Sequence, residues 1–101
     1  MSAYIIVQAK ITDPEKFKAY PAEAAKLVAK FGGTYRVLGG TAEGLEGEWS
    51  ESKVVMSEWP DYETALAFWR SPEYSAVKSL REGAADVVVF AVDGVNQQQL
   101  S

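Results

Sequence analysis

The sequence predicts an α+β domain whose elements follow the order β-α-β-β-α-β. Four segments are rich in β-branched or alternating apolar residues, which is typical of strands: 3–11, 34–40, 53–59 and 86–94. Between the first and second strands, and again between the third and fourth, apolar residues recur at spacings of three and four, which favours helices. This order suits a ferredoxin-like sandwich, in which a four-stranded antiparallel sheet carries both helices on one face.

The first helical segment, residues 12–33, has clear ends and one internal conflict. Asp13 suits the N-cap position, where its carboxylate accepts a backbone N–H, and a proline follows it at the first helical position. The glycine pair Gly32-Gly33 suits the end, because glycine readily adopts the left-handed conformation. Pro21 removes one backbone hydrogen bond inside the apolar pattern, so we expect it to kink the helix or to split off its first turn.

The second helical segment begins after Pro60 and is broken in the middle. Asp61 suits its N-cap, and the expected apolar stripe of the first part is Tyr62, Ala65, Leu66 and Trp69. Ser71 and Pro72 then restart the helix in a new direction, as its cap and first residue. The buried side of this second part is expected to contain Val77, Leu80 and Ala84.

The remaining segments define the extent of the domain. Residues 41–52 connect the second and third strands, carry four Glu and no Lys or Arg, and are expected to form a loop. We expect residues 1–94 to form a single domain, and residues 95–101 to form a flexible C-terminal tail.

The strands are apolar on both faces, although two helices can cover only one face of the sheet. In the first strand, Ile5, Val7, Ala9 and Ile11 alternate with Tyr4, Ile6, Gln8 and Lys10. An uncovered apolar face usually marks an interaction site. We therefore expect a homodimer in which two sheets pack face to face and close a dimeric α/β barrel.

The composition excludes several kinds of site and partner. The 101 residues contain no Cys and no His, so disulfides, the usual zinc sites and a Ser-His-Asp triad are excluded, and we expect no metal and no cofactor. The net charge is −4 and no basic stripe is present, so nucleic acid is not an expected partner. The first residues lack a basic segment before their short apolar run, and no apolar run approaches ~20 residues, so we expect a cytoplasmic protein without a membrane partner.

Several motifs resemble the DUF1330 family: "DPEKFKAY", "KFGGTYRVLGG", "EGEW", "KVVMSEWPDYETALAFWRSPEY" and "VVVFAVDG", together spanning about residues 3–94. The resemblance implies the dimeric α/β barrel, and it implies no particular reaction. An Arg is common in the family just before the second Gly pair, where this chain has Leu38, and the closing Glu-Gly is Asp93-Gly94 here. Arg36, two residues earlier and expected on the same strand face, is the candidate to replace that Arg in binding an anionic ligand.

Glu58 is the first candidate catalytic residue. It shares a strand face with Val54 and Met56. Burial against such a surface would disfavour its charged form and make it a useful general acid or base. The alternative is a carboxylate that is exposed at the strand end or paired structurally with an Arg.

Arg81 is the second candidate catalytic residue. It follows Tyr74 by seven residues, or two helical turns, so both side chains should lie on one side of the helix. Together they could present a guanidinium and a phenol to a ligand carboxylate. The alternative is an Arg whose stem covers apolar surface while its head pairs with Glu82 or Asp86.

Three further residues are candidates for ligand binding. Trp69 and Tyr74 flank the helix break and could form the wall of a pocket, although such aromatic residues are more often part of the core. Gln8 is a polar residue in an apolar strand, and a ligand or Glu58 could supply its hydrogen-bond partner.

Two hypotheses of function follow from these residues. In the first, a dimeric protein binds a small organic ligand between its sheet and its broken helix, and acts on that ligand as a cofactor-independent enzyme. In the alternative, the chain is a non-enzymatic dimerisation or interaction module whose aromatic and Arg side chains are structural. The sequence does not assign a reaction, because fold analogy is weak evidence for function.

Overall fold

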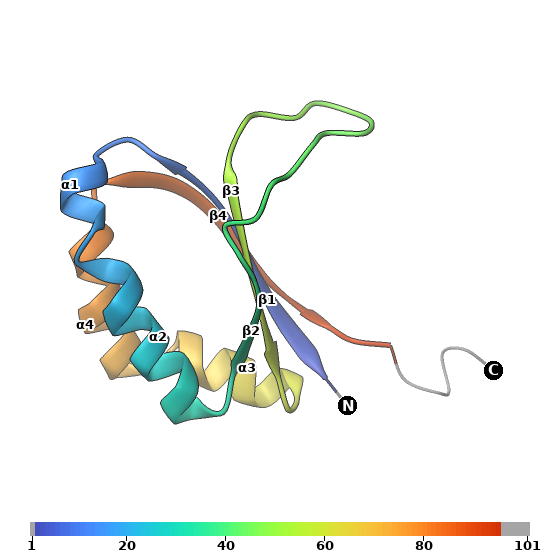
Figure 1. Cartoon of the computed structure of the whole chain (residues 1–101). Coiled ribbons are helices and arrows are strands. Elements are labelled where there is room, and N and C mark those ends of the chain that lie inside the picture. The colour runs from blue at the N-terminus through green and yellow to red at the C-terminus, as the bar shows by residue number, and fades with distance from the viewer. Residues whose placement is uncertain (1, 96–101) are drawn as a thin grey trace.

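Four strands form one antiparallel sheet in the order β2-β3-β1-β4, in a computed structural model that describes residues 2–95 (Figure 1). The strands are β1 (Ala3–Ile11), β2 (Thr34–Leu38), β3 (Lys53–Trp59) and β4 (Ala85–Asp93). The helices are α1 (Pro14–Phe17), α2 (Tyr20–Phe31), α3 (Tyr62–Trp69), α4 (Pro72–Lys78) and the short 3-10 helix η1 (Ser79–Arg81). The predicted tail, apart from residue 95, lies outside the described residues.

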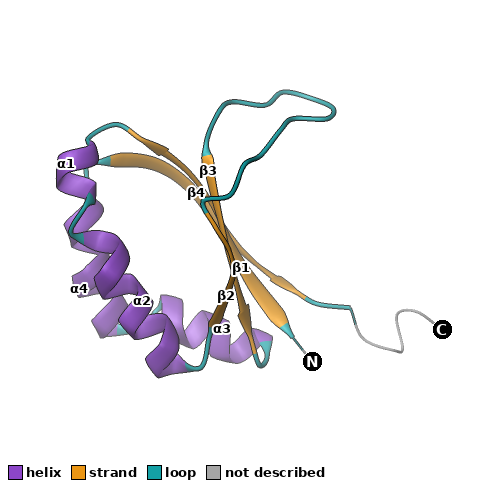
Figure 2. Ribbon diagram, viewed as in Figure 1, coloured by secondary structure: helices purple, strands orange, loops and turns teal. Residues whose placement is uncertain are grey.

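All helices lie on one face of the sheet, which confirms the predicted α+β ferredoxin-like arrangement (Figure 2). We call the face that the helices cover the inner face, and the opposite one the outer face. The connection between β2 and β3 extends away from the helices as a long loop (Figure 1). Within the described range, every helix is too short or too polar to span a bilayer.

The first helical segment is split at the position that the sequence predicted. Helix α1 ends at Phe17, and α2 begins at Tyr20 with Pro21 in its first turn. Proline is tolerated there because the first turn of a helix needs no backbone N–H donor. Gly32 ends α2 in the left-handed conformation, with φ 97°.

The second helical segment is also broken as predicted, but its apolar stripe was partly wrong. The carboxylate of Asp61 accepts the backbone N–H of Thr64 at 2.7 Å, and Ser71 Oγ accepts that of Tyr74 at 3.1 Å. The residue of α3 that packs into the core beside Ala65 is Phe68, which is 4% exposed, whereas Tyr62 is 37% exposed. The apolar pattern of a helix of about two turns predicts the buried side only to within about one residue, since successive side chains are rotated by about 100° around the helix axis.

An aromatic cluster forms the core between the helices and the inner face. The ring of Phe68 stacks on Trp59 with centroids 4.7 Å apart, and it contacts Tyr74 at 4.9 Å. Gly33 lets the chain pass directly over Trp59, because a Cβ atom there would lie 2.7 Å from the indole ring. These contacts fix the end of β3 against α3 and α4.

The outer face of the sheet is exposed and apolar along β4. Val88, Phe90 and Val92 are 61%, 45% and 41% exposed. Inner and outer side chains alternate along the strand, so the neighbouring Val89 and Ala91 pack against the core. The pattern that predicted a two-faced sheet is therefore present in the structure.

Candidate functional site

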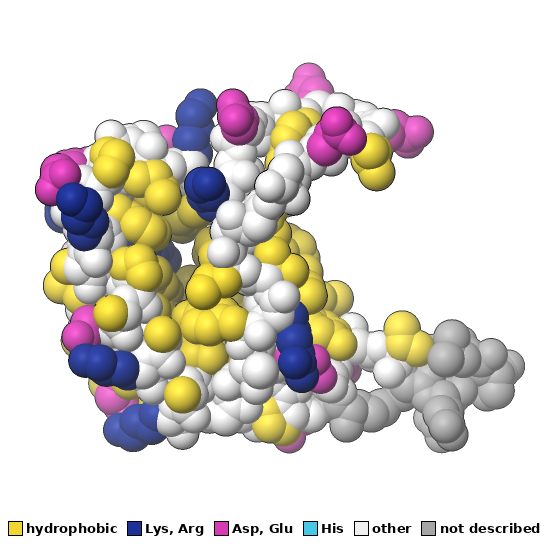
Figure 3. Space-filling model, in the orientation of Figure 1, with side chains coloured by type: hydrophobic (Ala, Val, Ile, Leu, Met, Phe, Trp, Pro, Cys, Tyr) yellow, Lys and Arg dark blue, Asp and Glu magenta, His cyan; other side chains and the backbone are white. Residues whose placement is uncertain are grey.

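A cavity of about 430 Å³ lies between the inner face and the helices. Figure 3 shows the hollow between these two layers, with hydrophobic side chains along it. Its walls are mostly aliphatic and aromatic, and include Ile5, Val7, Ala24, Val28, Phe17 and Phe68. A cavity of this size and character is typical of sites for one small organic molecule.

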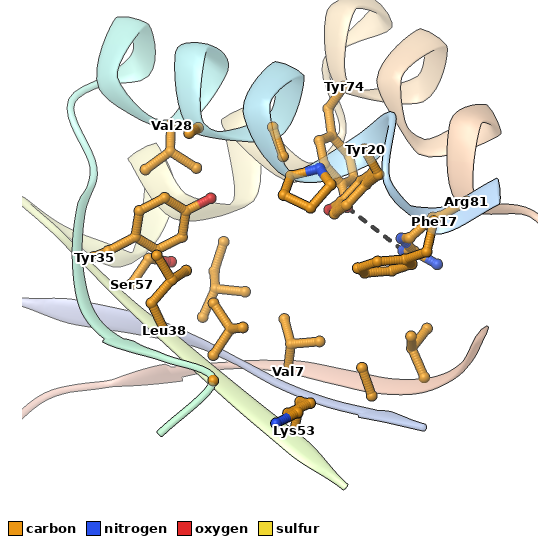
Figure 4. Close-up of a pocket in the computed structure, with 18 of the residues that line it drawn as sticks. Val7, Phe17, Tyr20, Val28, Tyr35, Leu38, Lys53, Ser57, Tyr74 and Arg81 are labelled. Atoms are coloured by element: carbon orange, nitrogen blue, oxygen red, sulfur yellow. Dashed lines mark hydrogen bonds between the residues drawn. The ribbon is translucent and has the colours of Figure 1, made fainter. Parts of the chain in front are cut away.

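Arg81, Tyr74 and Tyr20 form a polar cluster in the cavity wall (Figure 4). The hydroxyl groups of Tyr20 and Tyr74 are 2.7 Å apart and share one hydrogen bond. Arg81 Nη2 lies 3.5 Å from the Tyr74 hydroxyl, at the long limit of such a bond, and the guanidinium carbon lies 5.3 Å from the centre of the Tyr20 ring. Tyr20 on α2 therefore joins Tyr74 and Arg81, which are seven residues apart on α4 and η1, and one cation and two phenols come together.

The protonation states of this cluster make it a hydrogen-bond donor. Burial raises the pKa of Tyr20 well above its ordinary value, and the neighbouring Tyr74 hydroxyl adds to this effect. Burial by itself would lower the pKa of Arg81, but its contacts with Tyr74 and Tyr20 outweigh that effect and raise the pKa. The guanidinium therefore stays charged and Tyr20 stays a neutral phenol.

Arg81 is only 7% exposed, yet none of the ion pairs formed among residues 2–95 includes it. The sequence left open a structural pairing with Glu82 or Asp86, but both of these residues are exposed and neither forms an ion pair with Arg81. The charge of Arg81 therefore lies beside the cavity without a compensating carboxylate from the described part of the chain.

A second pair of hydroxyl groups faces the cavity from the sheet. Ser57 on β3 and Tyr35 on β2 are cross-strand partners on the inner face. Figure 4 places both on the side of the cavity opposite Arg81. Burial raises the pKa of Tyr35, with a smaller contribution from Tyr74, so its hydroxyl also stays protonated.

Glu58 lies on the outer face and does not line the cavity. Ser2 Oγ donates to one of its carboxylate oxygens at 2.6 Å, and Arg36 Nε donates to the other at 2.9 Å. These two bonds hold the pKa of Glu58 below its ordinary range. The raised pKa expected of a general acid or base is therefore wrong for Glu58, and the structural pairing with an Arg is what the structure contains.

Arg36 also lies away from the cavity, because it follows the inward-facing Tyr35 and side chains alternate along a strand. A register shift in β2 then changes the face of Leu38. Tyr35 pairs with Ser57 and Val37 pairs with Met56, so Arg36 is an extra residue between them. The shift places Leu38 beside the cavity, while Arg36 pairs with Glu58. The expectation that Arg36 and Leu38 share a strand face is wrong for this reason, and Arg36 does not face a ligand in the cavity.

The remaining two candidates lie in different places. Trp69 lines the cavity and packs on Tyr74 with ring centroids 4.6 Å apart, so it combines the two roles that the sequence left open. Gln8 does not line the cavity: its strand partners are Val54 and Val88, whereas Glu58 pairs with Tyr4. The contact between Gln8 and Glu58 that we considered is therefore not formed.

Sequence reasoning missed Tyr20, Tyr35 and Ser57 as residues of the site. Tyr20 belongs to the apolar pattern of the first helix, which hid its hydroxyl group. Ser57 carried a usable signal, because a serine between valine and tryptophan on one strand face is a buried polar group that requires a partner. Within residues 2–95, no group of three or more His, Cys, Asp or Glu side chains is arranged to hold a metal ion.

Comparison with known families identifies the chain. The family described as "Domain of unknown function (DUF1330)" matches residues 2–95. The chain belongs to the DUF1330 family. A search of curated proteins finds no match to this DUF1330 chain.

Solved structures show that this DUF1330 fold is shared widely. A protein of unknown function from Rhodopseudomonas palustris superposes with a TM-score of 0.72 at 18% identity, over 94% of this chain and 83% of that one. SnoaB, described as a cofactor-independent oxygenase from Streptomyces nogalater, gives 0.68 at 13% identity over 95% of both chains. A protein from Thermobifida fusca, described as dimeric, ferredoxin-like and of unknown function, gives 0.63 at 16% identity over 93% of this chain and 92% of that one. At these identities the similarity supports the fold alone.

Proposed function

We propose that this protein binds a small organic acid in the cavity between its helices and its sheet. The observation that carries the proposal is Arg81, a guanidinium that is buried beside the cavity and has no carboxylate partner among residues 2–95. A charge that is removed from water is costly unless an opposite charge and hydrogen bonds compensate it. A ligand carboxylate on Arg81 would supply both.

The two tyrosines support an anionic rather than a neutral ligand group. A phenol has one proton, and the bond between Tyr20 and Tyr74 uses only one of the two protons that the pair carries. The second proton and the N–H groups of Arg81 remain as donors, and a carboxylate is an acceptor only. Because burial keeps Tyr20 protonated, the cluster continues to donate hydrogen bonds near neutral pH.

The rest of the cavity supports an organic ligand rather than an inorganic anion. Aliphatic side chains from β1 and α2 and aromatic side chains from α1 and α3 form most of its surface. Burying a ligand's apolar surface against them contributes roughly 25 cal/mol per Å². A small molecule with a carboxylate at one end and a flat or aliphatic body matches both parts of the site.

The site supports binding better than it supports a defined reaction. SnoaB is described as a cofactor-independent oxygenase, but at 13% identity its likeness to this chain carries no activity. Among residues 2–95, no Asp or Glu lines the cavity, and the raised pKa of Tyr20 makes this phenol a poor general base. A cofactor-independent reaction on the bound acid therefore stays a prediction without a residue to carry it.

We also propose that a second copy of the chain packs on the outer face. Val88, Phe90 and Val92 are exposed there as a continuous apolar row on β4. Proteins from Bacteroides fragilis and Thermobifida fusca with this fold are described as dimeric. Two sheets packed face to face would cover the row and form the predicted dimeric α/β barrel. The cavity lies on the other side of the sheet, so dimerisation and ligand binding are compatible.

Calorimetric titration tests the binding proposal. Benzoate, cinnamate and 2-naphthoate are titrated into the protein beside their neutral primary amides. We expect at least one acid to bind about tenfold or more tightly than its amide, since hydrogen bonds to charged groups contribute about 1.5–3 kcal/mol.

Two variants make the test specific. Arg81→Met removes the charge at similar length and should cancel the preference for the acid, whereas Arg70→Met removes an exposed Arg outside the cavity and should retain it. An amide that binds as tightly as its acid, an unchanged preference in Arg81→Met, or the absence of binding by every acid would contradict the proposal.

A further inference from the structure

Two hydroxyl groups on the inner face of the sheet remain outside the carboxylate site. Ser57 and Tyr35 pair across β3 and β2, and both line the cavity. They lie on the side of the cavity that is opposite Arg81 (Figure 4). A carboxylate held by Arg81 would therefore leave them free to contact the other end of the same ligand.

The Ser57 hydroxyl accepts a hydrogen bond, but within residues 2–95 its own proton makes none. The indole Nε1–H of Trp59 donates to Ser57 Oγ at 2.8 Å. Indole nitrogen is a donor only, so the direction of this bond is fixed and Ser57 is the acceptor. Among residues 2–95, Ser57 Oγ donates to no protein acceptor in return.

The surroundings of Ser57 make an unused donor costly. Ser57 is 5% exposed and Trp59 is 1% exposed, so bulk water does not surround this pair. A buried hydroxyl whose proton has no acceptor loses the hydrogen bond that it would make in water. Ser57 lines the cavity, so a ligand in the cavity can supply the acceptor for the Ser57 hydroxyl proton.

Tyr35 provides a second donor beside Ser57. Its hydroxyl forms no hydrogen bond within the described part of the chain. Burial keeps it protonated by raising its pKa. A ligand oxygen in the cavity beside β2 and β3 can accept from these hydroxyl groups, because such an oxygen has two lone pairs.

We infer that the ligand is an acid with a second oxygen acceptor, a carbonyl or hydroxyl group, at the end of its body opposite the carboxylate. This inference rests on the proposed function, since Arg81 sets the orientation of the ligand. It narrows the ligand class from small organic acids to oxo or hydroxy acids. Arg81 with Tyr20 and Tyr74 binds the carboxylate, and Ser57 with Tyr35 binds the second oxygen.

The test compares two probes of nearly the same shape, 4-acetylbenzoate and 4-isopropylbenzoate. They differ in the carbonyl oxygen, which a methyl group replaces in the second probe. We expect the wild-type protein to bind 4-acetylbenzoate about fivefold to tenfold more tightly in calorimetric titration, as one or two hydrogen bonds would provide. In Tyr35→Phe and in Ser57→Ala this ratio should fall toward one.

Two variants are used so that the inference can still be tested if one of them does not fold. Ser57→Ala leaves the buried Trp59 nitrogen without an acceptor and is expected to lower thermal stability, whereas Tyr35→Phe retains that hydrogen bond. The ratio in Tyr35→Phe therefore decides the inference if Ser57→Ala does not fold.

The outcomes separate the two proposals. Equal binding of both probes by wild type, or a preference that survives in Tyr35→Phe and Ser57→Ala, would overturn the second acceptor and leave the organic-acid site intact. Failure of both probes, together with failure of benzoate, cinnamate and 2-naphthoate, would overturn the proposed function itself.

Discussion

Arg81 on the inner side of the sheet and Arg36 on its outer side have the same side chain in opposite surroundings. Arg36 is exposed and its charge is matched by Glu58 at 2.9 Å. Arg81 is buried, contacts the side chains of Tyr74 and Tyr20 and has no carboxylate beside it within residues 2–95. The first arrangement is complete without a ligand, whereas the second would be completed by the carboxylate of the proposed ligand.

The same contrast holds for the apolar residues of the two faces. On the inner face, Phe68 and Trp59 are buried within the chain itself. On the outer face, Phe90 is left exposed by residues 2–95, and a second copy of the chain is the proposed cover. The inner face therefore contributes to the stability of the single chain and lines the proposed ligand cavity, and the outer face carries the proposed dimer contact.

Removal of Phe68 should give the largest change on the inner face. Phe68→Ala removes the ring that contacts Trp59, Tyr74 and Phe31, and should lower the free energy of unfolding by about 3–5 kcal/mol. Urea denaturation followed by tryptophan fluorescence measures this loss, with Tyr62→Ala on the exposed side of α3 as the control. A loss below about 1 kcal/mol would show that the aromatic cluster is not the core of the domain.

Introducing a charge on the outer face should have the next largest effect, and it should weaken the association of two copies of the chain. Phe90→Asp places a carboxylate in the proposed dimer interface and should raise the dimer dissociation constant about a hundredfold or more, equivalent to about 2.7 kcal/mol. Light scattering after size-exclusion chromatography measures the mass across a dilution series, with Phe90→Leu as the matched control. A wild-type protein that is monomeric at micromolar concentration would contradict the dimer.

The two arginines should respond in opposite directions to the same substitution. Without ligand, Arg81→Met replaces a buried charge that has no carboxylate partner among residues 2–95 by an apolar side chain, and should raise the free energy of unfolding by about 1 kcal/mol. Arg36→Met leaves Glu58 without its partner and should lower stability slightly. Thermal unfolding of both variants tests this pair, and a strongly destabilised Arg81→Met would mean that Arg81 is a structural residue.

The smallest expected effect is the pH dependence that Glu58 adds. Hydrogen bonds from Ser2 and Arg36 hold the pKa of Glu58 below its ordinary value, so its carboxylate stabilises the fold at neutral pH. This contribution is fully present above about pH 4.3, the ordinary value for Glu, and is lost as the pH falls through the lower folded pKa.

Melting temperatures of wild type and Glu58→Gln measure the effect across a pH series. The difference between the two proteins should stay constant near neutral pH and shrink toward zero below about pH 4. A difference that grows on acidification would mean that the pKa of Glu58 is raised, and would restore Glu58 as a candidate acid or base.

Much of the secondary structure was predictable from local chemistry. Asp61 and Ser71 were assigned as caps, and both accept the expected backbone N–H groups. Pro21 was expected to split the first helix, and α2 begins one residue before it. These features depend on a few neighbouring residues, and the physics of caps and proline acts over the same short range.

The composition of the site was less predictable, because it depends on which face of each strand the helices cover. The alternation in β3 correctly separated Glu58 from Ser57, but both faces of that strand are apolar, so the pattern did not show which one faces the cavity. The extra residue in β2 then moved Leu38 to the inner side, while Arg36 stayed on the outer side. A strand pattern has a period of two residues, and one inserted residue reverses every assignment after it.

By itself, the sequence determined the order of the elements, the positions where helices begin and break, and the presence of two apolar sheet faces. It also indicated Tyr74 and Arg81 as neighbours, since seven residues are two helical turns. Only the tertiary structure decided that Tyr20 joins this pair and that Glu58 is excluded from it. Helix packing and strand register bring residues from distant segments together, and the strengths of burial and of charge pairing depend on those long-range contacts rather than on sequence neighbours.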